Sequence, residues 1–205
     1  MLEVKTYVLG PIRTNCYFIK DKSQGLGAII DPGGISKQLD SDITELGIEN
    51  VKYILLTHGH FDHITRASRY RRFTGAKIVI GKEEDEFTKD NSLNMSSMRG
   101  RKGIENFEAD LLLDDGESIF LGDTKITAIH TPGHTKGSIC YLADDVMFSG
   151  DTIMKEGLGR TDFPTGSKED LNASIKKLMA LDDNITVYPG HGDITNLGIE
   201  MKNYI

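Results

Sequence analysis

The heptapeptide Thr-His-Gly-His-Phe-Asp-His at residues 57–63 directly follows an apolar run and limits the kind of site that the chain can form. Each imidazole at the end of a buried strand costs desolvation free energy unless it has a partner. A metal cation can be the shared partner of several imidazoles. His58 and His60 lie two residues apart, so on an extended segment they point to the same side. Asp62 and His63 follow a turn and can reach a second point. The heptapeptide therefore offers donors for two metals, and the alternative is a polar loop of hydrated histidines.

Three more glycine-rich turns carry metal-binding residue types, and each follows a predicted strand. They are Thr-Pro-Gly-His-Thr at 131–135, Ser-Gly-Asp-Thr at 149–152 and Pro-Gly-His-Gly at 189–192. Glycine lets the backbone bend sharply, and loops at strand ends are frequent positions of functional sites. We therefore expect seven groups to converge: His58, His60, Asp62, His63, His134, Asp151 and His191.

Hydrophobic periodicity predicts strands and helices arranged in two similar β-rich halves. The predicted strands are 4–9, 16–20, 27–30, 51–56, 77–80, 111–113, 118–121, 124–129, 139–142, 146–149 and 186–188. The predicted helices are 36–46, 64–73, 82–89, 167–178 and 196–204. Two such halves packed face to face, with the helices outside, would form a four-layer sandwich.

Length and charge limit the class of protein. The 205 residues fit one domain with a sizeable core, and no change of composition marks a linker. A net charge of -7 provides no basic field for nucleic acid or anionic membranes. No apolar run reaches the roughly 18 residues of a membrane span, and no signal-peptide pattern is visible. Cys16 and Cys140 fit a reducing cytoplasm, where we expect both to be buried packing residues.

The segment 91–110 has little pattern and includes the basic group Arg-Gly-Arg-Lys at 99–102. Irregular segments of this length are uncommon in compact domains unless they are functional or mobile. It is interpreted either as a lid or pocket wall or as a solvated surface loop.

The four motifs, in this order and over nearly the whole chain, resemble the metallo-β-lactamase superfamily. The resemblance implies an α/β fold, the four-layer αβ/βα sandwich, with one domain at 1–205 and a two-metal hydrolytic site. It implies that one metal is bound by His58, His60 and His134. It implies that the other is bound by Asp62, His63 and His191, with Asp151 bridging both.

This ligand set agrees with the chemistry of a two-metal hydrolase. Two adjacent dications need an anion between them, which Asp151 and a shared hydroxide would supply. Imidazole and carboxylate ligands suit zinc, iron and manganese, with zinc favoured. Bound water has a pKa near ~7, so a bridging hydroxide is available to attack a carbonyl or phosphoryl centre. Asp62 and Asp151 are therefore expected to be catalytic as well as metal-binding.

Three other polar residues are expected to support the ligands rather than bind metal. Asp31 and Thr57 are candidates for hydrogen bonds that orient a ligand imidazole. Asp31 is equally well explained as a turn residue before proline. His130, four residues before His134, is interpreted as a supporting or structural residue, with metal ligation as the alternative.

Within the superfamily, the chain most resembles the short bacterial form of glyoxalase II, the hydroxyacylglutathione hydrolases. The run Gly-Leu-Gly-Arg-Thr-Asp-Phe-Pro at 157–164 resembles the loop with which that group contacts glutathione, which implies that Arg160 binds substrate. The implied substrate is a small thioester such as S-lactoylglutathione. We expect no C-terminal helical domain like that of the full-length enzymes, and Asp162 stands where they place a glutathione-binding tyrosine. The alternative for Arg160 is an ion pair with Asp162.

Other functions remain open at this point. The Arg-Thr-Asp-Phe run also resembles persulfide dioxygenases, which would use one iron on His58, His134 and Asp151. A lactone or ester hydrolase and a non-catalytic metal-binding protein are further alternatives. True β-lactamases of this superfamily fit less well, because they generally lack the bridging aspartate.

Overall fold

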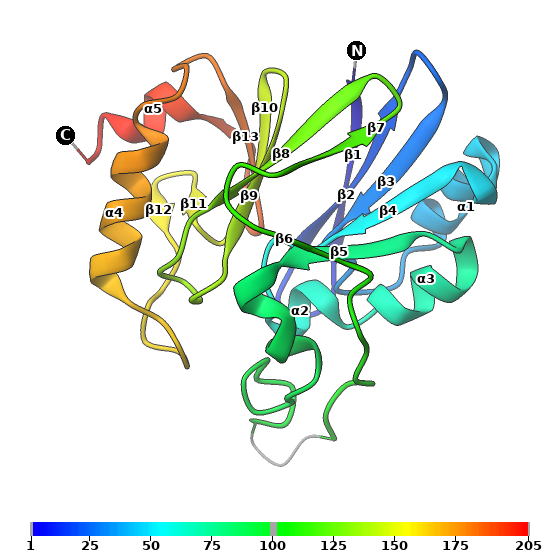
Figure 1. The fold of residues 1–205 in the computed structure, drawn as a ribbon, viewed down its shortest axis with the longest axis horizontal. Helices are drawn as coiled ribbons and strands as arrows, with labels where there is room; N and C mark the ends of the chain where they lie inside the picture. The colour runs from blue at the N-terminus through cyan, green and yellow to red at the C-terminus, as the bar shows by residue number, and fades with distance from the viewer. Residues whose placement is uncertain (1, 99–101, 205) are drawn as a thin grey trace.

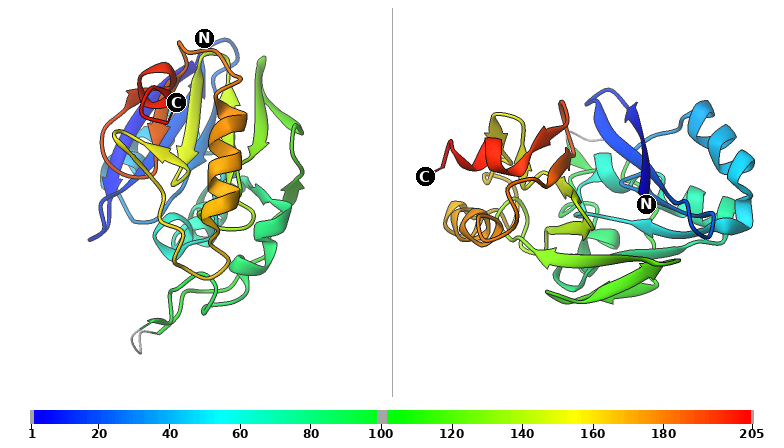
Figure 2. Two further views of the ribbon diagram at one scale, coloured as in Figure 1. Left: turned by 90° about the vertical axis from the view of Figure 1, so that its left-hand side faces the viewer. Right: turned by 90° about the horizontal axis from the view of Figure 1, so that it is seen from above.

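The computed structural model describes residues 2–98 and 102–204. Two six-stranded sheets face each other, and helices cover their outer faces (Figures 1 and 2). The predicted four-layer αβ/βα sandwich is therefore confirmed. In the described residues, no helix is both long enough and apolar enough to cross a membrane.

The first sheet contains the first half of the chain, in the strand order β1-β2-β3-β4-β5-β6. Its strands are β1 (Leu2–Leu9), β2 (Thr14–Asp21), β3 (Leu26–Ile30), β4 (Val51–Leu55), β5 (Lys77–Gly81) and β6 (Leu111–Leu113). The strands β1 to β3 pair antiparallel, whereas β3 to β6 pair parallel. The carboxyl ends of β3 and β4 consequently lie at the same edge of the sheet.

The second sheet has the order β14-β13-β10-β9-β8-β7. Its strands are β7 (Ser118–Leu121), β8 (Thr124–His130), β9 (Ile139–Ala143), β10 (Val146–Gly150), β13 (Thr186–Pro189) and β14 (Thr195–Asn196). A separate hairpin is formed by β11 (Ile153–Met154) and β12 (Gly157–Leu158). The strands β8, β10 and β13 run in one direction, because β9 is antiparallel to both β8 and β10 and β13 is parallel to β10. Their carboxyl ends therefore share one edge.

Helices lie outside both sheets. They are α1 (Lys37–Leu46), α2 (Phe61–Ile64), α3 (Ala67–Thr74), α4 (Lys168–Leu178) and α5 (Leu197–Met201), with the 3₁₀ segments η1 (Ile48–Asn50) and η2 (Lys82–Thr88). Serine caps begin α1 and α4, since the side chain of Ser36 accepts from the N–H of Leu39 and that of Ser167 from the N–H of Asp170.

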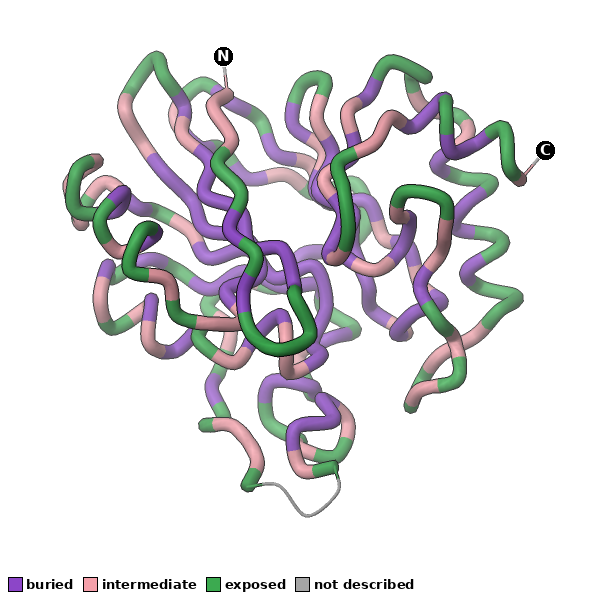
Figure 3. Tube along the Cα trace, turned by 180° about the vertical axis from the view of Figure 1, so that it is seen from behind, coloured by how far each residue is buried: buried purple, intermediate pink, exposed green. Residues whose placement is uncertain are grey.

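Three apolar cores account for the four layers. In β2, Tyr17 and Ile19 belong to the core between the sheets, whereas Cys16 and Phe18 face the core beneath α1 and α3. This alternation is the two-residue period of a strand that is buried on both faces. The third core lies between the second sheet and the helices α4 and α5. The tube in Figure 3 is correspondingly purple along the central strands and green along the outer faces of the helices.

The predicted helix at 64–73 was wrong in its boundaries. The chain forms α2, then bends at Thr65 and Arg66, and only then forms α3. The bend has a physical cause, because the N–H of Arg66 donates to the carbonyl of Pro32 and not to its own helix. The predicted helix at 82–89 is the 3₁₀ segment η2, and the predicted terminal helix shortens to α5. The strands β11, β12 and β14 were not predicted.

The irregular segment 91–110 is partly packed into the protein. Phe107 is buried in the core beneath α1 and α3, and the carbonyl of Asn94 accepts from the N–H of Phe61. Met95 lines a cavity beside the histidine cluster, which favours the pocket-wall interpretation for this part of the segment. Arg99, Gly100 and Arg101 lie outside the described residues.

Candidate metal centre

Seven predicted side chains come together at the edge where the two sheets meet. His58, His60, Asp62 and His63 follow β4, His134 follows β8, Asp151 follows β10, and His191 follows β13. The sheets are joined at this edge by backbone hydrogen bonds, from Ile139 to Thr57 and from Asn15 to Gly190. Four separate strand ends therefore supply one site.

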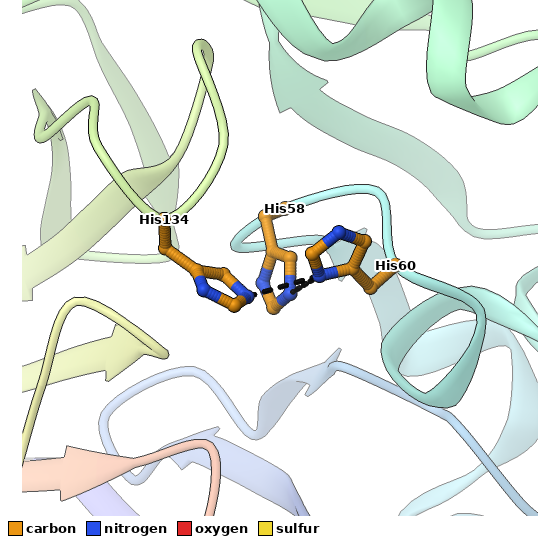
Figure 4. Close-up of side chains that lie close together, drawn as sticks. All are labelled: His58, His60 and His134. Carbon is orange, nitrogen blue, oxygen red and sulfur yellow. Dashed lines mark hydrogen bonds between the residues drawn. The ribbon is translucent and has the colours of Figure 1, made fainter. Parts of the chain in front are cut away.

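The first group consists of His58, His60 and His134 (Figure 4). The Nδ1 atom of His60 lies 3.1 Å from Nε2 of His58 and 2.9 Å from Nε2 of His134. All three rings are almost completely buried. Three ring nitrogens aimed at one point, without a carboxylate among them, form a site for a cation that accepts nitrogen ligands.

The second group consists of Asp62, His63 and His191. The Oδ2 atom of Asp62 lies 3.3 Å from Nε2 of His191 and 3.5 Å from Nε2 of His63. Asp151 stands between the two groups, because its carboxylate oxygens lie 3.5 Å from His134 Nε2 and 3.5 Å from His63 Nε2. This position is the one that a bridging carboxylate requires.

Unpartnered buried atoms show that these residues fit a metal. Nε2 of His63 and Oδ1 of Asp151 are buried and have no hydrogen-bond partner within residues 2–98 and 102–204. These two atoms face each other at 3.5 Å, too far apart for a good hydrogen bond. A buried polar atom without a partner costs free energy, and a metal ion between the two would remove that cost.

Hydrogen bonds to the opposite ring nitrogens orient the ligands. Nδ1 of His63 lies 2.8 Å from Oδ2 of Asp31, and Nδ1 of His134 lies 2.7 Å from the carbonyl oxygen of Arg160. Both acceptors require an N–H at Nδ1, which in the neutral ring leaves the Nε2 lone pair directed at the site. Asp31 also accepts from the N–H and hydroxyl of Thr57, next to His58. The orienting roles predicted for Asp31 and Thr57 thus have matching contacts.

The protonation of the first group suits nitrogen ligands. Burial, followed by repulsion from the neighbouring imidazoles, holds the pKa of His58 well below its ordinary value. Burial and the ring of His134 lower the pKa of His60 to about 3. Both rings are therefore neutral at neutral pH, the form that binds a metal.

The second group carries opposite charges when no metal is bound. Burial alone would lower the pKa of His63, but the carboxylates of Asp62, Asp151 and Asp31 raise it to about 10. Burial alone would raise the pKa of Asp62, but His63, His191 and Thr14 hold it well below its ordinary value. In the metal-free protein, His63 is therefore protonated, and its positive charge replaces the charge that a bound metal would supply.

A cavity of about 460 Å³ opens directly onto the histidines. Apart from the proposed metal ligands, its wall is mostly apolar: Ile12, Phe61, Met95, Met154, Leu158 and Phe163. Among the described residues that line it, Arg160 is the one arginine or lysine, with its guanidinium 4.0 Å above the ring of Phe163. Arg160 also forms a bidentate ion pair with Asp162, in which Nε lies 2.6 Å from Oδ1 and Nη2 lies 2.5 Å from Oδ2. This is the contact given above as the alternative for Arg160. Both side chains of the pair are exposed.

The remaining histidine lies apart from the two groups. Nε2 of His130 lies 2.9 Å from the carbonyl oxygen of Lys136, in the loop that carries His134. Its backbone N–H donates to Asp115. These contacts favour the structural interpretation of His130 over metal ligation.

Three polar residues at the site were missed from the sequence. The hydroxyl of Thr14 donates to Oδ2 of Asp62 at 2.7 Å. The amide of Asn15 donates to the carbonyls of Pro189 and Gly192, on either side of His191. Glu84 accepts hydrogen bonds from the backbones of two ligand loops. In the sequence, the one signal for a role at the site is that Thr14 and Asn15 lie next to a turn.

The fold and the site together define a metal-dependent hydrolase with an αβ/βα sandwich. The profile of the metallo-β-lactamase superfamily matches residues 9–191, and the chain belongs to this superfamily. The protein is 37% identical to the hydroxyacylglutathione hydrolase GloC of Haemophilus influenzae, over 92% of this chain and 90% of that one.

Solved structures agree with this assignment. The BLEG-1 B3 metallo-β-lactamase is 36% identical, with a TM-score of 0.86 over 98% of this chain and 97% of that one. The ETHE1 protein of Myxococcus xanthus is 28% identical, with a TM-score of 0.76 over 98% of this chain and 83% of that one.

Proposed function

We propose that this protein hydrolyses thioesters such as S-lactoylglutathione with two divalent metals, in the manner of glyoxalase II. The observation that carries the proposal is the position of Asp151, whose two oxygens approach a histidine of each group at 3.5 Å. Zinc is the favoured metal, and iron or manganese would suit the same donors. Two ions held there would supply a water that is deprotonated near neutral pH and a Lewis acid for the substrate carbonyl.

The carboxylates organise the reacting water in this proposal. Asp62 is held in place by the Thr14 hydroxyl, and its low pKa keeps it ionised as an acceptor for a water proton. Asp151 holds the two histidine groups at a fixed separation. A thiolate leaves without a strong general acid, because thiols are more acidic than alcohols.

The cavity wall is suited to the acyl part of a thioester. Met95, Met154 and Phe163 surround the approach to His134 and would keep bulk water away from the carbonyl. Methionines adapt to ligands of different shape, so this wall accepts more than one acyl group. The likeness to GloC supports a hydroxyacyl thioester of glutathione.

Arg160 is the proposed contact for a carboxylate of the thiol carrier. Its guanidinium can bind a carboxylate with two hydrogen bonds, but those donors are engaged by Asp162. Because the pair is exposed, the exchange of Asp162 for a substrate carboxylate costs little. Arg160 therefore favours carriers that bring a carboxylate to the cavity mouth.

A one-iron persulfide dioxygenase is the second candidate. Nε2 of His134 lies 3.5 Å from Asp151, and His58 and Asp151 occur together in one possible metal group, so the three required residues are adjacent. The likeness to ETHE1 also favours this candidate.

One set of assays on the purified protein separates these functions. Metal content is measured, and hydrolysis of S-lactoylglutathione is compared with oxygen uptake on glutathione persulfide. Two metals with thioester hydrolysis support the proposal, whereas one iron with oxygen uptake supports the alternative. A lactone, a simple ester and a β-lactam are tested in parallel, and turnover of one of these without thioester hydrolysis would refute the thioester assignment.

A further inference from the structure

Glu84 is a buried carboxylate in η2, the 3₁₀ segment that follows β5. Its exposed fraction is 0%. Glutamate is almost never fully buried unless it is paired. Yet within the described ranges 2–98 and 102–204, no basic side chain lies within 4 Å of this carboxylate, and the nearby Lys136 pairs with Glu86 instead. The position of Glu84 therefore needs another explanation.

Both oxygens of Glu84 bind the backbones of loops that carry proposed metal ligands. Oε2 accepts from the N–H of Gly59 at 2.7 Å, and Oε1 accepts from the N–H of Gly137 at 3.0 Å. Gly59 lies between His58 and His60, and Gly137 lies three residues after His134. The two loops come from opposite sheets, so one carboxylate joins the two halves of the first histidine group.

Close packing holds this link in place. A Cβ atom on Gly59 would lie 2.2 Å from Cβ of Phe87 and 2.8 Å from Oε2 of Glu84. A Cβ atom on Gly137 would lie 2.6 Å from the backbone of Glu83 and Glu84. Both loops thus press against η2 at glycines, which brings their N–H groups within reach of the carboxylate.

The charge of Glu84 complements the first histidine group. Burial raises the pKa of the Glu84 carboxyl to about 7, and hydrogen bonds from Thr135, Gly59 and Gly137 oppose only part of that rise. A cation held by His58, His60 and His134 would supply the positive charge that the protein side chains do not. The ionised carboxylate and the bound cation then stabilise each other, because such coupling is reciprocal.

We propose that Glu84 is a positioning residue for the first metal, which fixes His58 and His60 relative to His134 through the backbones of Gly59 and Gly137. It touches neither metal nor substrate. This inference rests on the two-metal site of the proposed function but not on its substrate, so failure of thioester hydrolysis would leave it standing.

Glu84→Gln provides the test, because glutamine keeps the volume but turns one acceptor into a donor that faces a backbone N–H. Glu86→Gln is the matched control, since Glu86 lies in the same segment, carries the same charge and is exposed. Each change is made in a His191→Ala background, which leaves the first group intact, and in a His60→Ala background, which leaves the second. Zinc affinity is measured by competition with a chromophoric chelator.

The expected result is a loss of zinc affinity of about 10- to 100-fold for Glu84→Gln in the His191→Ala background. In the His60→Ala background the change should stay within about twofold, and Glu86→Gln should have no effect in either. Equal losses at both groups would mean a merely structural role and would overturn the proposal, as would unchanged affinity. Thermal unfolding of the metal-free variants checks the fold. If Glu84→Gln does not fold, Glu84→Asp, which keeps the charge, should show a smaller loss with the same site preference.

Discussion

The substitution Asp31→Asn should weaken the binding of zinc by the second histidine group. Asp31 is 2% exposed and accepts three hydrogen bonds, from the Thr57 N–H at 2.8 Å, the Thr57 hydroxyl at 2.6 Å and His63 Nδ1 at 2.8 Å. Asparagine has nearly the same shape but only one acceptor oxygen. The backbone φ of Asp31 is 49°, a conformation that asparagine also tolerates, so the substitution adds little backbone strain.

Either orientation of the new amide removes an interaction. If the amide oxygen faces His63, the amide NH₂ opposes the buried N–H of Thr57, at a cost of about 1–3 kcal/mol. If the NH₂ faces His63, Nδ1 must accept and the proton moves to Nε2, the nitrogen directed at the metal site. The loss of negative charge weakens the orientation of His63 in both cases. We therefore expect zinc to bind the second group about 10- to 100-fold more weakly, which corresponds to roughly 1.4–2.7 kcal/mol.

The assay is zinc competition in the His60→Ala background, with thermal unfolding measured on the same samples. Asp40→Asn is the control, because it removes an equal charge from the partly exposed pair with Arg69, on α1 and α3. Asp31→Asn that folds and binds zinc with unchanged affinity would refute the orienting role of Asp31.

Three further predictions concern pH, packing and the bridging carboxylate. Because folding raises the pKa of His63, the protonated ring stabilises the metal-free fold. This stabilisation is complete at pH values below the ordinary histidine pKa of 6.5 and is lost as the pH rises toward about 10. The unfolding temperature of the metal-free protein should therefore fall from pH 7 to pH 9. Thermal unfolding in the presence of a chelator measures it, and a rise over this range would contradict the prediction. Gly59→Ala should lower the free energy of unfolding by about 1–3 kcal/mol, because the added Cβ would overlap Phe87. Calorimetry measures the change in unfolding temperature, with Gly157→Ala as the control because that position has open space around it. Asp151→Ala should lose at least one metal per chain and abolish turnover, and full metal content with full activity would count against its bridging position.

The proposed metal ligands could be selected from the sequence because their residue types and their spacing are visible in the chain. Histidines and aspartates placed directly after apolar strands, next to glycines, indicated four loops at one edge. The parallel course of β8, β10 and β13 is what brings those loops together. The alternation in β2 likewise follows from its sequence, where apolar residues occupy both faces.

Contacts made through remote backbones could not be predicted. Glu84 sits in an acidic segment that looks like a solvated surface, and its backbone partners are the N–H groups of residues 25 and 53 positions away. The break between α2 and α3 depends on the carbonyl of Pro32, which no periodicity reveals. The ion pair of Arg160 with Asp162 was one of two alternatives that the sequence left open, because spacing alone does not separate a paired arginine from one that binds substrate.

We propose that two divalent metals, held by the two histidine groups, make this protein a thioester hydrolase. The decisive experiment is a titration of the metal-free protein with zinc, in which S-lactoylglutathione hydrolysis is followed at each addition. We expect no turnover without metal, and a maximum rate that is reached as the second equivalent of zinc binds. Hydrolysis by the metal-free protein, or none with two equivalents bound, would contradict it.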